Sequence, residues 1–186
     1  MAVLPDPRNQ GDPEVADAID RMAKVRADSD GRAELGQVYI AMFNNPAVAE
    51  RVGALGEYIR FEGCLPDRVR EIAILRFSFL QGMRYEWAHH VRPATLAGLD
   101  QSTIDSLAEP QVSSLTDGFE TAALRIVEHV ARGESIPAAV QAKFAGQYGD
   151  RGVVELVTLC GLYSLIGYTA ASFDIEIEPG LPEPPF

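Results

Sequence analysis

Two carboxylates and an imidazole occur at spacings that could bring them to one point. Glu86 and His90 are four residues apart, so a helix would carry both on one face. Glu71 lies on the preceding predicted helix among apolar neighbours, where a carboxylate needs a partner such as His90 or Arg68. A Glu–His pair in a partly dry pocket suits general acid–base chemistry, because burial raises the pKa of Glu and a nearby carboxylate raises that of His.

The same residues also allow two other interpretations. A Glu and a His one helical turn apart often form a structural surface pair worth a few tenths of a kcal/mol. Glu71, Glu86 and His90 could instead hold a divalent ion, because two carboxylates and one imidazole are ordinary metal ligands. No motif with a recognised metal spacing is present, and we therefore expect no metal.

The chain has two cysteines, Cys64 and Cys160, far apart and in no redox or metal-binding spacing. Cys160 lies in an apolar segment and is interpreted as a small core residue. Cys64 precedes the predicted helix pair and could approach the pocket, although a lone loop cysteine is more often incidental.

Two predicted helices must position the acid–base residues. The first begins at Pro66, which suits a first helical turn, and its apolar spacing fits a helix better than a strand. Gly82 is expected to end it, since glycine adopts the left-handed conformation cheaply. The second helix runs over 85–97 and ends at Gly98 for the same reason. The short loop between them predicts an antiparallel pair.

The rest of the chain reads mostly as helices that would support this pair, so we predict an all-α fold with a central antiparallel helix pair. Residues 1–12 are predicted to be an N-terminal arm, 13–174 a single helical domain, and 175–186 an extended, proline-rich tail. The longest apolar helix is expected to follow a break around Gly149, with Asp150 as its cap.

Composition disfavours several classes of partner. A net charge of −11 disfavours nucleic acid and an anionic membrane surface. The 18 residues over 156–173 carry no charge, which touches the lower limit for a membrane span. The acidic flanks Glu155 and Asp174, and the hydroxyl groups within the segment, favour a buried core helix instead. No apolar segment of signal-peptide type opens the sequence, and we expect a cytoplasmic protein without a membrane partner.

The run R-E-I-A-I-L-R, the glycine that follows it, Y-E-W-A-H-H and A-G-L together resemble the carboxymuconolactone decarboxylase family, which includes the alkylhydroperoxidase D-like proteins. The match is strongest over about residues 51–107. The resemblance implies an alkylhydroperoxidase D-like helical bundle that assembles as a homo-oligomer, a trimer or a hexamer.

In the peroxidase branch of this family, a Glu precedes a Cys-x-x-Cys pair, and a His follows four residues after the second Cys. Laid on this chain, these positions fall on Glu71, Met83, Glu86 and His90. Methionine and glutamate cannot act as thiolates, so the departure argues against thiol peroxidase activity. The decarboxylase branch, which acts on a lactone acid without cysteines or a metal, is implied as the nearer relative.

The hypothesis that follows is a cofactor-free lyase acting on a small lactone or carboxylic acid. His90 would be the general acid or base, Glu71 would set its tautomer, and Glu86 would orient the substrate or carry a proton. Arg76, Tyr85, Trp87 and His89 are the predicted substrate-binding residues, with Arg92 as a further candidate for a substrate carboxylate.

An alternative is a non-catalytic, homo-oligomeric binding protein that retains the fold, because fold does not fix function. In that case Glu71 and His90 would turn away from each other, beside a cleft lined by Trp87, Phe77 or Phe79.

Overall fold

The structure is a computed structural model that describes residues 4–30, 35–112, 115 and 118–186. All regular secondary structure in these residues is helical, which confirms the predicted all-α class. The elements in chain order are η1 (Pro7–Gln10), α1 (Pro13–Asp30), α2 (Gln37–Met42), α3 (Pro46–Glu57), η2 (Tyr58–Glu62), α4 (Asp67–Gln81), α5 (Arg84–Leu96), α6 (Gln101–Leu107), α7 (Gly118–Ala131) and α8 (Ala138–Ser172). The segment η1 is a 3-10 helix and η2 is a π-helix.

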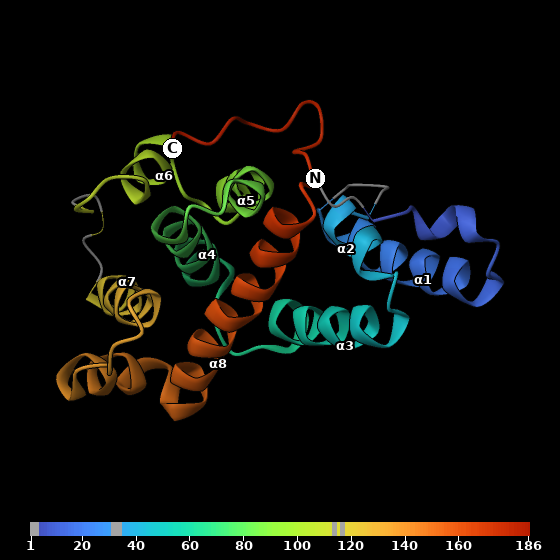
Figure 1. The fold of residues 1–186 in the computed structure, drawn as a ribbon. Helices are drawn as coiled ribbons and strands as arrows, with labels where there is room; N and C mark the ends of the chain where they lie inside the picture. Colours follow the sequence, from blue (N-terminus) through green and yellow to red (C-terminus); the bar gives the residue numbers. More distant parts are fainter. Residues whose placement is uncertain (1–3, 31–34, 113–114, 116–117) are drawn as a thin grey trace.

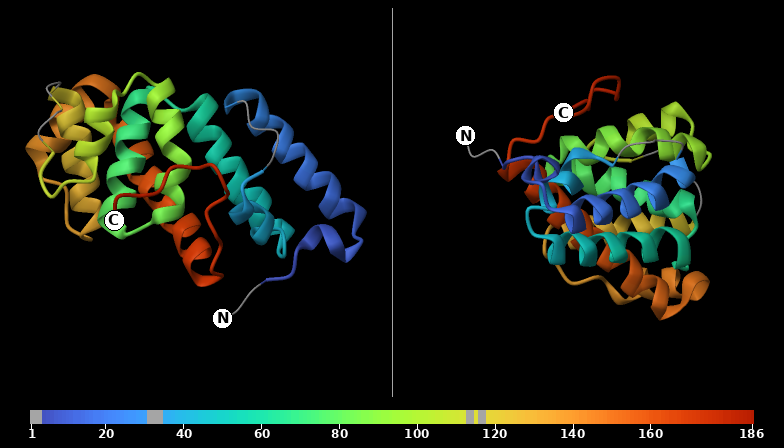
Figure 2. Two further views of the ribbon diagram at one scale, coloured as in Figure 1. Left: turned by 90° about the horizontal axis from the view of Figure 1, so that it is seen from above. Right: turned by 90° about the vertical axis from the view of Figure 1, so that its right-hand side faces the viewer.

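The helices α4 and α5 form the central pair (Figure 1). Helices α6 and α7 pack beside α4, and α8 crosses both members of the pair. On the other side of α8 lie α3, α2 and α1. Two further views show the same order of helices along the molecule (Figure 2). With neighbours on several sides, α4 is buried without interruption from Val69 to Ser78.

Both predicted ends of the central helices are confirmed. Gly82 follows α4 in the left-handed conformation, with φ 65°, and its N–H bonds to the carbonyl of Phe79. Gly98 lies beyond the end of α5 with φ 86°. These two glycines fix the lengths of the helices, and therefore which residues of each face the other.

The long helix α8 is broken at Gly149, where φ is 66° and ψ is 176°, which confirms the predicted break. Of the described helices, only α8 is long and apolar enough to cross a membrane, and half of its most apolar window is buried inside the structure. A core helix has the same composition, so the absence of a membrane partner stays a prediction.

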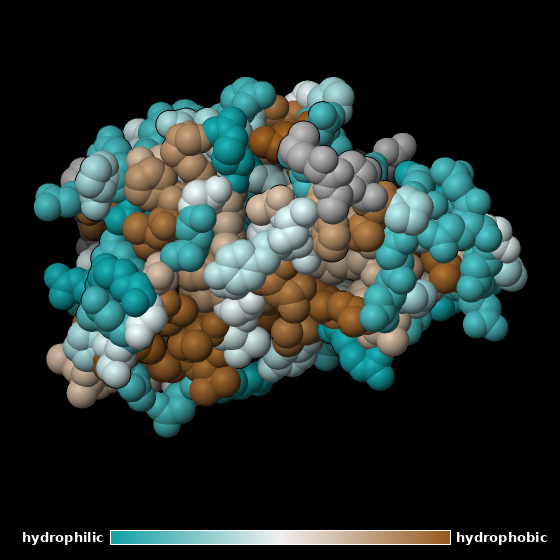
Figure 3. Space-filling view, in the orientation of Figure 1, coloured by the Kyte–Doolittle hydropathy of each residue, from teal (hydrophilic) through white to brown (hydrophobic). Residues whose placement is uncertain are grey.

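Part of α8 is exposed. Val154, Leu165 and Tyr168 keep large parts of their side chains accessible, and apolar surface covers the region of α8 (Figure 3). An exposed apolar helix face is typical of an interface. It agrees with the homo-oligomer that we predict, which stays a prediction.

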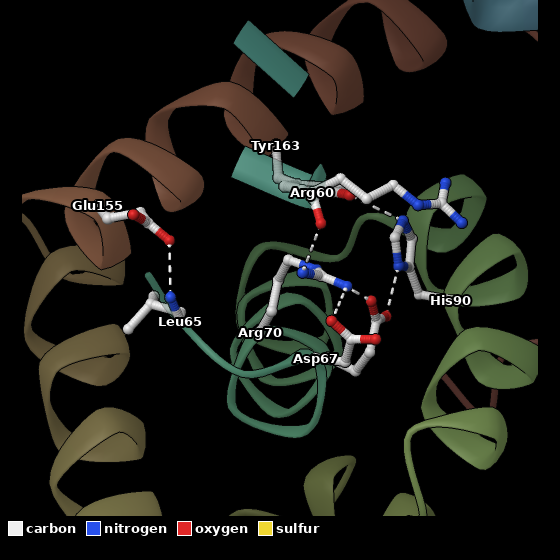
Figure 4. Close-up of polar contacts among 8 residues, drawn as sticks. Arg60, Leu65, Asp67, Arg70, His90, Glu155 and Tyr163 are labelled. Atoms are coloured by element: carbon white, nitrogen blue, oxygen red, sulfur yellow. Dashed lines mark hydrogen bonds and ion pairs between the residues drawn. The ribbon is translucent and has the colours of Figure 1, made fainter. Parts of the chain in front are cut away.

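A buried carboxylate on α8 holds the segment that leads into α4. The two carboxylate oxygens of Glu155 accept the backbone N–H groups of Cys64 and Leu65 at 2.9 and 3.0 Å; the bond to Leu65 is drawn in Figure 4. A Cβ atom at Gly63 would lie only 2.5 Å from Oε1 of Glu155, so glycine lets the carboxylate approach the backbone. Glu155 therefore fixes where α4 begins.

We expect Glu155→Ala to lower the free energy of unfolding by about 2–4 kcal/mol, because it leaves two buried N–H groups without acceptors. Urea unfolding followed by circular dichroism measures the change. Glu50→Ala on α3, where the side chain is 55% exposed, is the control and should shift stability by less than about 0.5 kcal/mol. Equal effects of the two substitutions would contradict the role given to Glu155.

Candidate active site

A cavity of about 110 Å³ lies among α2, η2, α4, α5 and α8. Apolar side chains form much of its wall. The wall also contains polar and charged side chains, among them Arg26, Arg60, Arg70, Glu71, Tyr85, Glu86, His89, His90 and Tyr163. All three predicted catalytic residues are therefore in one place.

His90 is held at both of its ring nitrogens. Its Nδ1 lies 2.7 Å from Oε2 of Glu71, and its Nε2 lies 2.9 Å from the hydroxyl of Tyr163 (Figure 4). Because an ionised carboxylate only accepts hydrogen bonds, Nδ1–H donates to Glu71, and Nε2 can then accept from Tyr163. Burial, with the charge of Glu71 second, raises the pKa of Tyr163 well above its usual value, so this hydroxyl keeps its proton.

The Glu71 carboxylate is 3% exposed and has a second partner. Oε1 of Glu71 lies 3.5 Å from Nε of Arg70. The same guanidinium donates to the Arg60 carbonyl at 3.3 Å and to Asp67 at 3.0 Å (Figure 4). A buried carboxylate is stable only with such partners, and here they also fix its orientation toward His90.

Glu86 has the opposite environment. Its side chain is 2% exposed and lines the cavity, and neither carboxylate oxygen bonds to another described residue. Burial raises the pKa of Glu86 to about 7. Near neutral pH this group can both give and take a proton, which is the property of an efficient general acid or base.

Of the predicted substrate-binding residues, Tyr85 and His89 line the cavity. Arg76 and Trp87 do not. Arg76 is 2% exposed on another face of α4, where it pairs with Glu128 at 2.7 Å. Trp87 packs against Phe186 with ring centroids 5.4 Å apart. The structure thus gives Arg76 and Trp87 packing partners away from the cavity, and Arg92, which is exposed, is not in the lining either.

In the described residues, no three His, Cys, Asp or Glu side chains cluster in a way that could hold a metal ion. This part of the chain therefore offers no ligand set for the metal interpretation. Both ring nitrogens of His90 already have partners. Glu71, Glu86 and His90 share a cavity but do not share a coordination point.

Besides Arg26 and Arg70, sequence reasoning missed three further residues of this region. Tyr163 was visible only as one hydroxyl in an apolar run of α8, and Arg60 only as one of several arginines. The third is Glu178 in the tail, which bonds to Tyr85 and His89. Nothing in a proline-rich segment signals such a contact.

The segment that contains the central pair is similar to a known family. Residues 46–129, which contain the central pair with Glu71 and His90, match the model of the carboxymuconolactone decarboxylase family. That segment of the chain is therefore similar to this family. A comparison with curated proteins gave no match.

Three solved structures share the fold. A cysteine-to-alanine variant of the debrominase Bmp8 in complex with 2,3,4-tribromopyrrole has 18% identity and a TM-score of 0.74, over 90% of this chain and 89% of that chain. Apo Bmp8 has 19% identity and a TM-score of 0.71, over 90% and 87%. ATU0492 from Agrobacterium tumefaciens, a protein of unknown function proposed to be the antioxidant defence protein AhpD, has 20% identity and a TM-score of 0.64, over 74% and 94%. These TM-scores show that the chain has the alkylhydroperoxidase D-like fold, as the sequence predicted.

The buried Glu86 should make stability depend on pH. Its pKa is about 7 in the folded chain against 4.5 for an ordinary Glu, so the native state keeps a proton that the unfolded state loses between these values. The free energy of unfolding then falls as pH rises through this window. Glu86→Gln removes the effect, and we expect the variant to gain about 3 kcal/mol over the wild type between about pH 5 and about pH 8.

Urea unfolding at both pH values measures this difference. The exposed Glu50→Gln is the control and should track the wild type at both values. A stability difference between Glu86→Gln and the wild type that does not change with pH would contradict the environment described for Glu86.

Proposed function

We propose that this protein is an acid–base enzyme of the carboxymuconolactone decarboxylase type, which acts on a small lactone or carboxylic acid without a cofactor. The arrangement of side chains around His90 supports this proposal. His90 is held between Glu71 and Tyr163 in the wall of a cavity that also contains the buried Glu86.

The cavity has positive charge for a substrate carboxylate. Arg26, Arg60 and Arg70 line it, and Arg70 already pairs with Glu71. Arg60 extends toward His90 (Figure 4). A guanidinium binds a carboxylate in a bidentate manner. We therefore assign the substrate carboxylate to Arg60, with Arg26 as its neighbour, in place of the Arg76 predicted from sequence.

The groups around His90 form a base. In a proton shift within the lactone, Tyr163 Oη takes a proton from a substrate carbon while its own proton passes to His90 Nε2, and the same relay run in reverse returns a proton to the substrate. The resulting imidazolium is stabilised by Glu71, whose carboxylate lies 2.7 Å from Nδ1. The direction follows from the hydrogen bonds, since Tyr163 donates to His90 and His90 donates to Glu71.

Glu86 is the matching acid. Loss of carbon dioxide leaves an electron pair that spreads into the substrate as an enolate, and that enolate must be stabilised and then protonated. Glu86 carries a proton near neutral pH, because burial raises its pKa to about 7. The two carboxylates of the cavity thus take different roles because their surroundings differ.

The thiols of the chain support the proposal that it is not a thiol peroxidase. Met83 and Glu86 stand at the two cysteine positions of the peroxidase pattern. Burial raises the pKa of Cys160 to about 12. Burial and the neighbouring Glu155 raise the pKa of Cys64. Neither sulfur has the lowered pKa that a reactive cysteine needs.

The binding-protein alternative is less well supported. That alternative predicts that Glu71 and His90 turn away from each other, whereas Oε2 of Glu71 lies 2.7 Å from Nδ1 of His90. A Glu–His hydrogen bond beside a cavity that also holds the buried carboxyl group of Glu86 is more than a scaffold requires.

The experiment is turnover of carboxymuconolactone and a panel of small lactone acids, measured as carbon dioxide release. We expect wild-type turnover that His90→Ala, Glu71→Gln and Glu86→Gln each lower by about 10²- to 10⁴-fold. His129→Ala is the matched control: this histidine lies on α7, pairs with Glu134, and should not affect turnover.

Two results would contradict the proposal. One is activity on a lactone acid that survives both His90→Ala and Glu71→Gln. The other is an absence of turnover by the folded wild type across the whole panel.

A further inference from the structure

The C-terminal residues 175–186, here named the strap, lie across the central helix pair. The strap leaves the end of α8 and crosses over α5 without forming a helix (Figures 1 and 2). It is held to α5 at two places along its length.

The first place is Glu178. Its carboxylate lies 2.7 Å from His89 Nε2 and 2.8 Å from the Tyr85 hydroxyl, and it accepts the backbone N–H of Gln37 at 3.0 Å. Tyr85 and His89 stack on each other, with ring centroids 4.3 Å apart, and both line the cavity. One carboxylate therefore ties α2 to α5 along the edge of the cavity.

The contacts of Glu178 keep it charged. Burial opposes the charge, but the bonds from His89, from the Gln37 N–H and from Tyr85 outweigh it and lower the pKa of Glu178 to about 2. A hydrogen bond to a charged group is stronger than a neutral one. Glu178 thus holds the strap on the rings of Tyr85 and His89 at neutral pH.

The second place is the end of the strap. The ring of Phe186 meets Trp87 and Phe79 edge-on, with centroids 5.4 and 5.3 Å apart. Arg84 donates to the Phe186 carbonyl and pairs with Glu183 at 3.2 Å. Four prolines lie between Glu178 and Phe186, and they limit the conformations of a released strap, so that docking it again loses little entropy.

We propose that the strap is a lid of the cavity and that Glu178 is its latch. The strap does not line the cavity itself, but its Glu178 bonds to Tyr85 and His89, which do. Its start packs against the core through Ile175 and Ile177. From Glu178 onward it forms no helix, so this part can lift without unfolding one. Lifting it releases the wall formed by Tyr85 and His89, and closing it shuts the cavity around a ligand and excludes water. The inference concerns access to the cavity and holds whether or not the proposed reaction is correct.

The test uses the full chain and diethyl pyrocarbonate, which modifies accessible imidazoles, with peptide-resolved mass spectrometry of each histidine. Glu178→Gln should raise the modification rate of His90 roughly tenfold, the factor expected from losing a hydrogen bond to a charged group. His90 is the informative residue because its contacts are with Glu71 and Tyr163 and not with Glu178. His129 on α7 is the internal reference and should react equally in all variants.

Glu183→Gln is the matched control, because it changes a strap carboxylate that is 85% exposed. It should leave His90 at the wild-type rate. If circular dichroism shows that Glu178→Gln is not folded, Tyr85→Phe removes one latch bond and keeps the ring stack, and it should raise the His90 rate in the same direction. A rise at His89 alone, with His90 unchanged, would overturn the lid and leave Glu178 as a local partner of His89.

Discussion

The bond between the Glu71 carboxylate and the imidazole of His90 is the interaction on which this structure depends. Helix α4 is surrounded by α5, α7 and α8, so the charged side chains between Val69 and Ser78 are buried away from bulk water. An unpaired buried carboxylate is strongly destabilising. Glu71 must therefore meet His90 on α5 and Arg70 on its own helix, and these contacts set how α4 and α5 face each other. The hydrogen bond that stabilises the buried Glu71 therefore also orients the imidazole of His90.

The two carboxylates of the cavity illustrate how environment assigns chemistry. Glu71 has a cation on one side and an imidazole on the other. Glu86, on α5, lies in the same cavity with no such partner among the described residues. One group is therefore held as a charged orienting partner, and the other as a proton carrier near neutrality. At the position of the second cysteine in the peroxidase pattern, this chain carries the carboxyl group of Glu86.

Much of this could be predicted from the sequence, for reasons that are local. The glycines at 82, 98 and 149 end or break helices because of their own conformational freedom. Helical spacing places Glu86 and His90 on one face. Because Glu71 lies among apolar residues, its carboxylate requires a partner, which the next helix can supply. The resemblance to a family, which the match over residues 46–129 supports, adds the fold in which this helix pair is central.

The parts of the site that the sequence did not predict depend on contacts between segments far apart in the chain. Tyr163 is 73 residues from His90, and Glu178 is 89 residues from His89, so no periodicity connects them. Arg76 looked suitable because it is an arginine near Glu71. Five residues along a helix place it on a different face, where it bonds to Glu128. A sequence pattern tells which residues share a face, but not which neighbour that face meets.

The central claim is that His90 is fixed between Glu71 and Tyr163, and nitrogen NMR of the imidazole tests it most directly. A long-range proton–nitrogen spectrum of labelled protein identifies which ring nitrogen carries the slowly exchanging proton. The structure predicts that proton on Nδ1, bonded to Glu71, and its loss or marked shift in Glu71→Gln. A His90 with its proton on Nε2 alone, and a spectrum that does not respond to Glu71→Gln, would contradict the account.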